Sequence, residues 1–283
     1  MKGNVRSRGG LRKDNRAVSP AISTTILTSA IVVLLIVTIV FVNNFLDQRM
    51  AENEFSAMKQ FMQTVGLQID DVAWTIGRTQ TISYSSKFGQ VNFESDALTY
   101  KVYVNGTVYF ANYTTGIIMF NMPVSKYSLG NNYYESVYPS NDSFLQTGTS
   151  APVSRVYVME KLPMKNGSNF IRIVVVPIIR MLNSTIFTGE KTVNYFKFYL
   201  PILSSGSHPR YSQSVTLRGK TVSVKSQSGV TSVKIEVFPN ESIGFDSEFF
   251  NFESLTVEVK NIPSGSVIEF YTGEVEVSLG LHV

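Results

Sequence analysis

Side chains able to perform catalytic chemistry are few in this chain of 283 residues. The two histidines are His208, in a stretch rich in serine and glycine, and His282, next to the C-terminus. Neither lies in a metalloprotease, nucleophile-elbow or phosphate-binding motif. Cysteine is absent, which excludes disulfides and thiolate metal sites and leaves the redox compartment undetermined. The sequence therefore predicts a protein that is not an enzyme and binds no cofactor.

Carboxylates are the remaining candidates for acid–base or metal chemistry. Asp246, Glu248 and Glu253 lie close together in the segment GFDSEFFNFES, but they lack the spacing of a calcium-binding loop. Asp70 and Asp71 are adjacent, and on a helix they would be polar positions rather than a catalytic pair. A glycosidase needs two carboxylates placed across a cleft. We predict no catalytic residue and no metal site from these patterns.

Glycosylation acceptors are the most frequent chemical motif in the chain. Six asparagines have the N-x-[ST] pattern that marks surface loops of secreted proteins. We expect their side chains to be accessible to solvent and some to carry glycans. The alternative is that a composition rich in Asn, Ser and Thr produces the motif without modification. The six residues are Asn105, Asn112, Asn141, Asn166, Asn183 and Asn240.

A long uncharged stretch dominates the N-terminal part of the chain. The thirty residues between Arg16 and Asp47 include no Lys, Arg, Asp or Glu, and residues 21–42 form an apolar run. A helix of that length, rising ~1.5 Å per residue, crosses the ~30 Å hydrocarbon core of a bilayer. The positive-inside rule then predicts a cytoplasmic N-terminus and an extracellular C-terminal domain. A cleaved secretory signal is the alternative, but the run is longer than usual and ends without a small-residue cleavage site.

The junction between the basic leader and the apolar run has the sequence RAVSPAI, from Arg16 to Ile22. Ser19 can cap the first free amides of a helix, and Pro20 suits its first position. The junction resembles the class III signal peptide of archaeal type IV pilin-like proteins, and this resemblance covers about residues 12–45.

The pilin resemblance implies a processing site and a set of partners. A prepilin peptidase would cleave between Ala17 and Val18, on the cytoplasmic side of the membrane. The mature chain would then associate with copies of itself or with other pilins. Bacterial pilins have Glu at the fifth mature position, where this chain has Ile22, so packing that depends on that Glu is not implied. A simple signal-anchored surface protein is the alternative.

The basic character of the chain belongs to its leader. The first seventeen residues hold six of the 25 basic residues and one of the 21 acidic ones, which leaves 19 and 20. The mature chain would therefore have a formal charge of −1. This charge gives no support for binding of nucleic acid.

An apolar seam follows the membrane stretch. Seven apolar residues alternate at spacings of three and four, which is typical of one face of a helix. We predict one long helix from residue 18 to 78, with residues 21–42 in the membrane and 43–78 as an amphipathic extension. The seam packs either on the protein's own β-domain or on a neighbouring subunit, and we expect Phe55 to Met62 to stay partly exposed as an assembly face. The seam residues are Phe55, Met58, Met62, Val65, Ile69, Val72 and Ile76.

The rest of the chain is rich in short β-patterns. Residues 79–203 form a β-rich region in which Asn105 and Gly106 predict a tight hairpin turn. Residues 125–150 are polar and predict a long loop or irregular arm. Residues 204–210 are a candidate linker. Six short strands in 211–283 predict a sandwich-like domain or the second half of the same head.

These patterns predict an α+β protein with one long N-terminal membrane-spanning helix and an all-β, sandwich-like extracellular head. The function they favour is a structural subunit of a type IV pilus-like surface filament, whose head is adhesive and glycosylated. The main alternative is a single-span surface protein that binds a sugar or a protein, with the Tyr-rich segment 127–138 as its contact surface. A membrane-anchored hydrolase that uses carboxylates is a third alternative.

Overall fold

A computed structural model describes residues 20–106, 108–161, 169–188, 191–207 and 213–280. The chain divides into two compact units, residues 1–49 and residues 50–283, and we call the second unit the head. Ala17 and Val18 of the predicted cleavage site, both histidines and Asn166 lie outside the described residues. A long apolar helix is followed by a large all-β domain, so the predicted α+β fold class is confirmed.

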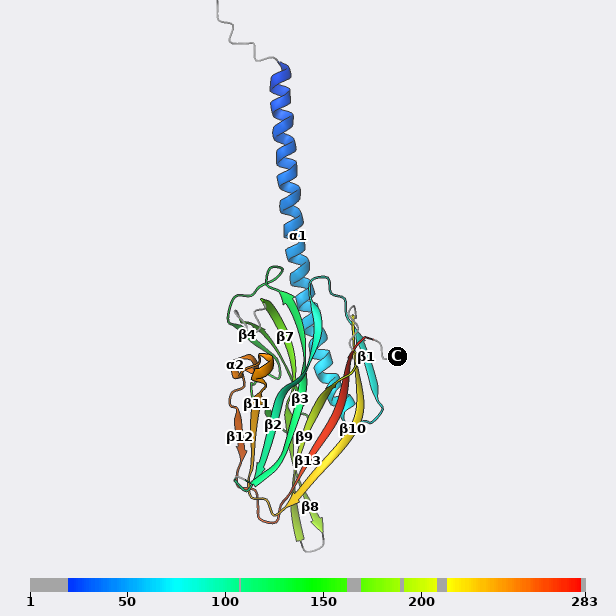
Figure 1. Ribbon diagram of the computed structural model, residues 1–283, viewed down its shortest axis with the longest axis vertical. Helices are drawn as coiled ribbons and strands as arrows, with labels where there is room; N and C mark the ends of the chain where they lie inside the picture. Colours follow the sequence, from blue (N-terminus) through cyan, green and yellow to red (C-terminus); the bar gives the residue numbers. More distant parts are fainter. Residues whose placement is uncertain (1–19, 107, 162–168, 189–190, 208–212, 281–283) are drawn as a thin grey trace, which may run out of the picture. The chain divides into compact units, whose positions relative to one another are not determined.

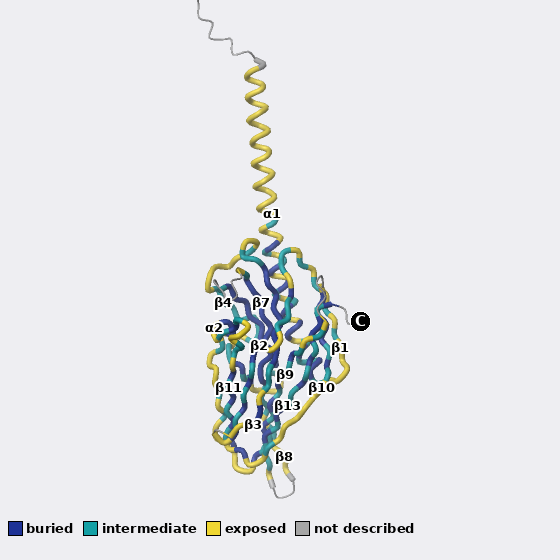
Figure 2. The backbone as a smooth tube through the Cα atoms, in the orientation of Figure 1, coloured by how far each residue is buried: buried dark blue, intermediate teal, exposed yellow. Residues whose placement is uncertain are grey.

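The helix α1 runs from Pro20 to Ala73. Its residues are exposed through most of the first unit, and its pattern becomes mixed from Ala51 onward (Figure 2). This change follows the sequence, because the uniformly apolar stretch gives way there to the seam pattern. The predicted extension to residue 78 is too long, since Ile76 lies beyond the helix.

Across the described residues, the strands of the head form a six-stranded sheet A and a seven-stranded sheet B (Figure 1). The strands of sheet A, in spatial order, are β1 (Thr79–Ser83), β10 (Ser214–Ser228), β13 (Val267–Leu279), β9 (Lys191–Ser205), β8 (Ile179–Thr188) and β5 (Leu145–Thr147). Those of sheet B are β12 (Thr256–Val259), β11 (Val233–Pro239), β2 (Gln90–Val104), β3 (Val108–Pro123), β7 (Phe170–Pro177), β6 (Ser154–Glu160) and β4 (Tyr133–Tyr138). A 3-10 turn η1 (Glu241–Ile243) and a short helix α2 (Ser247–Phe250) follow β11.

The two halves of the β-region are interleaved. Strands β10 and β13, from the C-terminal half, pair with each other and with β1 and β9, while β11 pairs with β2. Residues 211–283 are therefore the second half of one head, which was one of the two predicted arrangements. The candidate linker begins inside a strand, because β9 continues to Ser205, and its residues 208–210 lie outside the described residues.

The tight hairpin turn lies where the sequence predicts it. Asn105 and Gly106 both have positive φ, 48° and 90°, and the ladder closes with Val104 opposite Val108. Strand β7 ends at Pro177, and the chain then enters β8 in the other sheet. The segment 125–150 is more ordered than predicted, because it contains β4 and β5.

The seam is buried within the head. Six of its seven residues have at most 4% of their surface exposed, and only Ile76, beyond the helix, is 67% exposed. The expectation that Phe55 to Met62 stay exposed is therefore wrong. The reason is the length of the strands. The 16 residues of β3 extend about 50 Å, whereas α1 from Ala51 to Ala73 rises only about 35 Å, so the sheet reaches along this whole segment.

Contacts along α1 show how the head covers it. Phe55 packs against the rings of Phe120 on β3, at 6.4 Å, and of Tyr127, at 5.1 Å. At the other end, a Cβ added to Gly273 would lie 2.2 Å from the carbonyl oxygen of Ala73. Glycine at this position of β13 lets the last turn of the helix lie directly on sheet A.

Two hydrophobic cores result from this arrangement. One face of sheet B packs on sheet A and α2, with Tyr100, Tyr157 and Phe198 among its buried residues. The other face, together with parts of β10 and β13, covers the seam of α1. The helix segment 51–73 is thus a core element of the head.

Candidate functional site

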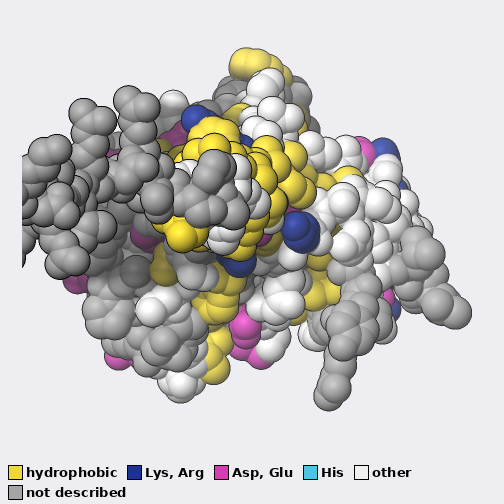
Figure 3. Space-filling model, turned by 90° about the horizontal axis from the view of Figure 1, so that it is seen from above, with side chains coloured by type: hydrophobic (Ala, Val, Ile, Leu, Met, Phe, Trp, Pro, Cys, Tyr) yellow, Lys and Arg dark blue, Asp and Glu magenta, His cyan; other side chains and the backbone are white. Residues whose placement is uncertain are grey.

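The exposed surface of α1 is the feature that most clearly needs a partner. The helix is long and apolar enough to cross a membrane, and no residue is buried in its most apolar stretch of 18 residues. Seen from above, hydrophobic side chains gather over α1 (Figure 3). Side chains such as Leu34 (65% exposed) and Phe41 (69% exposed) cannot remain in water at low cost, because each buried side chain of this size contributes about 1.5–3 kcal/mol.

Hydroxyl groups within this apolar surface are satisfied by the helix itself. Thr28 donates to the carbonyl oxygen of Thr24, Ser29 to that of Thr25, and Thr38 to that of Leu34, at 2.7–2.8 Å. A polar group without a partner is costly in hydrocarbon, and such internal bonds remove that cost. These three hydroxyl groups can therefore enter lipid without leaving a donor unsatisfied.

The seam no longer offers an assembly face in the described head. Phe55, Met58, Met62, Val65, Ile69 and Val72 are core residues, which corrects their assignment to subunit contacts. The exposed large apolar residues of α1 lie between Ile22 and Met50, with Leu67 as the exception within the described helix.

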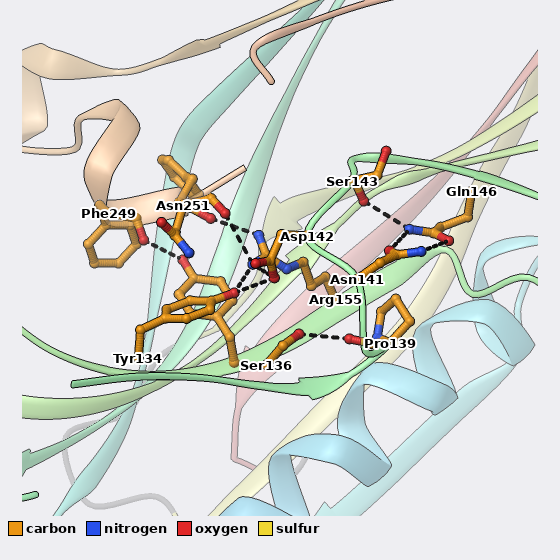
Figure 4. Close-up of polar contacts among 12 residues, drawn as sticks. Tyr134, Ser136, Pro139, Asn141, Asp142, Ser143, Gln146, Arg155, Phe249 and Asn251 are labelled. Carbon is orange, nitrogen blue, oxygen red and sulfur yellow. Dashed lines mark hydrogen bonds and ion pairs between the residues drawn. The ribbon is translucent and has the colours of Figure 1, made fainter. Parts of the chain in front are cut away.

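A buried arginine joins four segments of the head (Figure 4). The Arg155 side chain on β6 is 0% exposed. Its Nη1 donates to the carbonyl oxygen of Phe250 at 2.7 Å, and its Nη2 donates to Asp142 Oδ1 at 2.5 Å and to the carbonyl oxygen of Asn251 at 3.3 Å. The Tyr134 hydroxyl contacts the same Nη2 and donates to Asp142 Oδ1 at 2.6 Å.

Aromatic rings surround this guanidinium. It lies 4.9 Å from the ring centroid of Tyr157 and 5.3 Å from that of Phe252. Burial lowers the pKa of Arg155 and raises the pKa of Tyr157, whose hydroxyl donates to the carbonyl oxygen of Phe249 at 3.0 Å. Its two terminal nitrogens donate to the protein's own oxygens, whereas the buried Nε has no hydrogen-bond partner among the described residues. Through Nη1 and Nη2 the cluster fastens α2 to sheet B and is a structural element.

A groove of about 250 Å³ borders this cluster. It lies where the predicted Tyr-rich contact segment 127–138 meets α2, and its lining combines tyrosine rings, amides and charged groups. The lining residues are Asn132, Tyr133, Tyr134, Met159, Glu160, Lys161, Glu248 and Asn251.

Three of the five acidic residues noted in the sequence, Asp246, Asp70 and Asp71, accept hydrogen bonds or pair with arginine within the head. Asp246 caps α2 by accepting from the Phe249 amide at 2.9 Å. Asp70 accepts from the Trp74 indole at 2.8 Å and from Arg180 at 2.9 Å, whereas Asp71 pairs with Arg78. Within the described residues, no group of three or more His, Cys, Asp or Glu side chains could hold a metal ion.

Among the described glycosylation acceptors, none is buried. Asn105, Asn112, Asn141 and Asn183 are exposed, and Asn240 is half-buried. Asn240 also caps η1, because its Oδ1 accepts from the Ser242 amide, and its Nδ2 donates to the carbonyl oxygen of Asp96 at 2.9 Å.

The difference in environment predicts a difference in glycan occupancy. We expect Asn183, which is exposed on β8, to be modified to a higher extent than Asn240, where a sugar would displace the contacts of the cap. Glycopeptide mass spectrometry of material from the native host measures both sites in one sample. A modified Asn240 beside an unmodified Asn183 would contradict this order.

Arg155 was not singled out by the sequence analysis. Its position inside the apolar strand sequence SRVYVME indicates a buried polar cluster, because a charged residue in such a run is seldom fully buried without specific partners. Its partners come from segments about 13 to 96 positions away, and no spacing rule connects them.

Comparisons with protein-family models, with curated proteins and with solved structures find no match to this chain.

Proposed function

We propose that this protein is a membrane-inserted surface subunit similar to an archaeal type IV pilin. In this proposal the leader is removed between Ala17 and Val18, and the mature subunit assembles through its N-terminal helix. The observation that supports it best is the combination of a fully exposed apolar helix with a compact β-head. The RAVSPAI junction adds the processing site to this arrangement.

The proposed mechanism depends on removal of charge. Before cleavage, six basic residues lie between positions 2 and 16, in the leader that precedes the apolar run. Moving such charges through hydrocarbon costs about 2.5–3.5 kcal/mol each on insertion scales, so the uncleaved chain stays in the membrane. After cleavage the chain would begin at Val18, and the apolar surface of its helix could exchange lipid for the helices of neighbouring subunits.

Burial of the seam narrows the assembly surface in this proposal. Since Met58 and Met62 are covered by the head, we propose that subunits contact one another through the uniformly apolar segment of the helix. The head would then face solvent, where an adhesive role and glycosylation remain part of the proposal.

We predict that the mature protein begins at Val18, and matched variants of the preceding residue test this. Intact-mass and N-terminal peptide analysis should find Val18 at the N-terminus of the native chain and of Ala17→Gly, since the resembled motif has Ala or Gly there. Ala17→Phe should keep the leader and yield no filaments on shearing. An N-terminus near Met1 in the native chain contradicts the pilin proposal, and an N-terminus within 43–55 indicates secretory-signal cleavage.

The second candidate is a single-span surface protein that does not polymerise. The groove at Tyr133, Tyr134 and Glu160 favours it, because rings beside amides and carboxylates are typical of sugar and peptide sites. This candidate keeps its leader, so the same N-terminal analysis separates the two.

A further inference from the structure

The head begins at the point where the exposed apolar surface of α1 ends. Met50 is still 49% exposed, whereas Ala51 is completely covered by the head. From Val42, the end of the apolar run, to Ala51 the helix rises about 13 Å. The headgroup layer on each side of a bilayer is about 5–7 Å thick. At any inclination of the helix, this end of the head is therefore within about 10 Å of the headgroups.

Two loops lie at this end of the head, and each is held by an inward-facing carboxylate. Glu54 on α1 accepts from the amides of Lys87, Phe88 and Gly89 at 2.8–3.1 Å. It also accepts from the Ser86 hydroxyl at 2.5 Å. These bonds fix the loop 84–89 beside the first turn of α1 inside the head.

The second loop, residues 124–131, is held in the same manner. Glu160, which is 1% exposed, accepts from the Ser128 hydroxyl at 2.6 Å and from the amides of Leu129 and Gly130 at 2.7 and 3.2 Å. Tyr127 in this loop packs on Phe55. Both loops are thus positioned beside the entry of α1. The carboxylate of Glu160 is buried, and that of the half-buried Glu54 accepts from four donors of its loop.

The loops present cationic and apolar side chains. Their only charged residues in the sequence are Lys87 and Lys126, and both ammonium groups lie over the ring of Phe88, at 4.7 and 5.5 Å. Leu129 is 38% exposed. Lysine beside aromatic and aliphatic groups is the composition of surfaces that bind at the membrane interface, where ammonium groups meet anionic headgroups and rings enter the interfacial layer.

We propose that these two loops are a lipid-docking surface, at which Lys87 and Lys126 bind anionic headgroups while Phe88 and Leu129 enter the interfacial layer. The inference rests on the membrane-anchored part of the proposed function and is independent of leader cleavage and of filament formation. Docking would seat the head on the outer leaflet in the membrane-inserted subunit, and release of the loops from lipid would accompany departure of the helix into a filament.

The absence of cysteine makes the proposal directly testable, because any introduced cysteine is the only labelling site. Full-length protein is reconstituted in vesicles that contain a headgroup-linked nickel chelate, and a spin label is placed at S125C, beside Lys126. The matched control is S223C, an exposed serine on β10. A label at S29C in the apolar helix reports insertion.

The expected result is stronger relaxation by the headgroup nickel at S125C than at S223C in vesicles of phosphatidylcholine with phosphatidylglycerol. The difference should fall in pure phosphatidylcholine and at high salt. The double variant Lys87→Gln/Lys126→Gln should reduce docking by roughly 25-fold, about fivefold for each lysine. The control double variant Lys225→Gln/Lys260→Gln, on exposed residues elsewhere on the head, should leave it unchanged.

Equal relaxation at S125C and S223C, or a signal that the loop double variant does not change, overturns the proposal. If S29C is buried in lipid in that sample, the membrane anchor stands and only the docking surface fails. If S29C is exposed to water, the anchor itself fails and the docking surface fails with it.

Discussion

Replacing Met62 with glutamate is expected to destabilise the head by about 4 kcal/mol or more, a large part of the 5–15 kcal/mol that stabilises a typical domain. Met62 is 0% exposed and lies within the core that joins α1 to both sheets. The substitution removes its apolar burial and places a carboxyl group where no water can reach it. Urea unfolding of the full-length protein in detergent, followed by fluorescence of the single tryptophan, Trp74, measures the effect.

Leu67→Glu is the matched control for this substitution. Leu67 lies on the same helix but is 48% exposed, so its replacement should change stability by less than about 1 kcal/mol. Equal losses for Met62→Glu and Leu67→Glu would contradict burial of the seam in the head. A Met62→Glu protein with an intact head would restore the seam as a candidate for subunit contacts.

The pH dependence of the same variant separates charge from packing. A buried carboxyl group has a pKa above that of the unfolded chain, so the folded state binds the proton more tightly. The stability of Met62→Glu relative to Met62→Gln should therefore fall as pH rises from about 4 toward 7. A constant difference over this range would mean that the glutamate reaches solvent.

Replacing Arg155 with alanine is expected to lower the free energy of unfolding by about 3–5 kcal/mol, the range for removal of one partner from a buried ionic cluster. The substitution leaves the carbonyl oxygens of Phe250 and Asn251 without their donor and opens a cavity between aromatic rings. Arg155→Lys should lower the free energy of unfolding by an intermediate amount. An ammonium group keeps the charge but cannot reproduce the planar arrangement of donors by which the guanidinium reaches these acceptors.

The control for Arg155 is Lys260→Ala. Lys260 pairs with Glu258 at 3.1 Å but is 67% exposed, and surface ion pairs contribute little. Its loss should change the free energy of unfolding by less than about 0.5 kcal/mol. Should Arg155→Ala be no more costly than Lys260→Ala in the same urea titration, the guanidinium would not hold α2 against sheet B.

Short-range features of this protein follow from its sequence. The uniformly apolar sequence determines the exposed part of α1. The alternating spacing of three and four residues between apolar positions determines which residues of the helix segment 51–73 face inward. The positive φ values at Asn105 and Gly106 and the change of sheet after Pro177 are also local consequences of residue type. In each case the interacting groups are neighbours in the chain.

Strand length is set by pairing rather than by the local pattern. Strand β2 is one continuous strand although its ladder with β3 has a register irregularity between Glu94 and Leu98. Strand β10 likewise continues through Gly219, where its ladder with β13 shifts register before Thr221. A bulge interrupts the apolar pattern without ending the strand, because the paired strand continues to supply hydrogen bonds on both sides.

Only the tertiary structure decided what covers the seam. The sequence indicates that the seam residues from Phe55 to Val72 must be buried. A neighbouring subunit and the protein's own sheet satisfy that requirement equally well, because hydrophobic burial has no direction. The long bulged strands bring Phe120 and Gly273 to opposite ends of the helix segment 51–73, and their pairing depends on residues far apart in the chain. The same is true of Arg155, whose three partner segments meet its strand only after the head has folded.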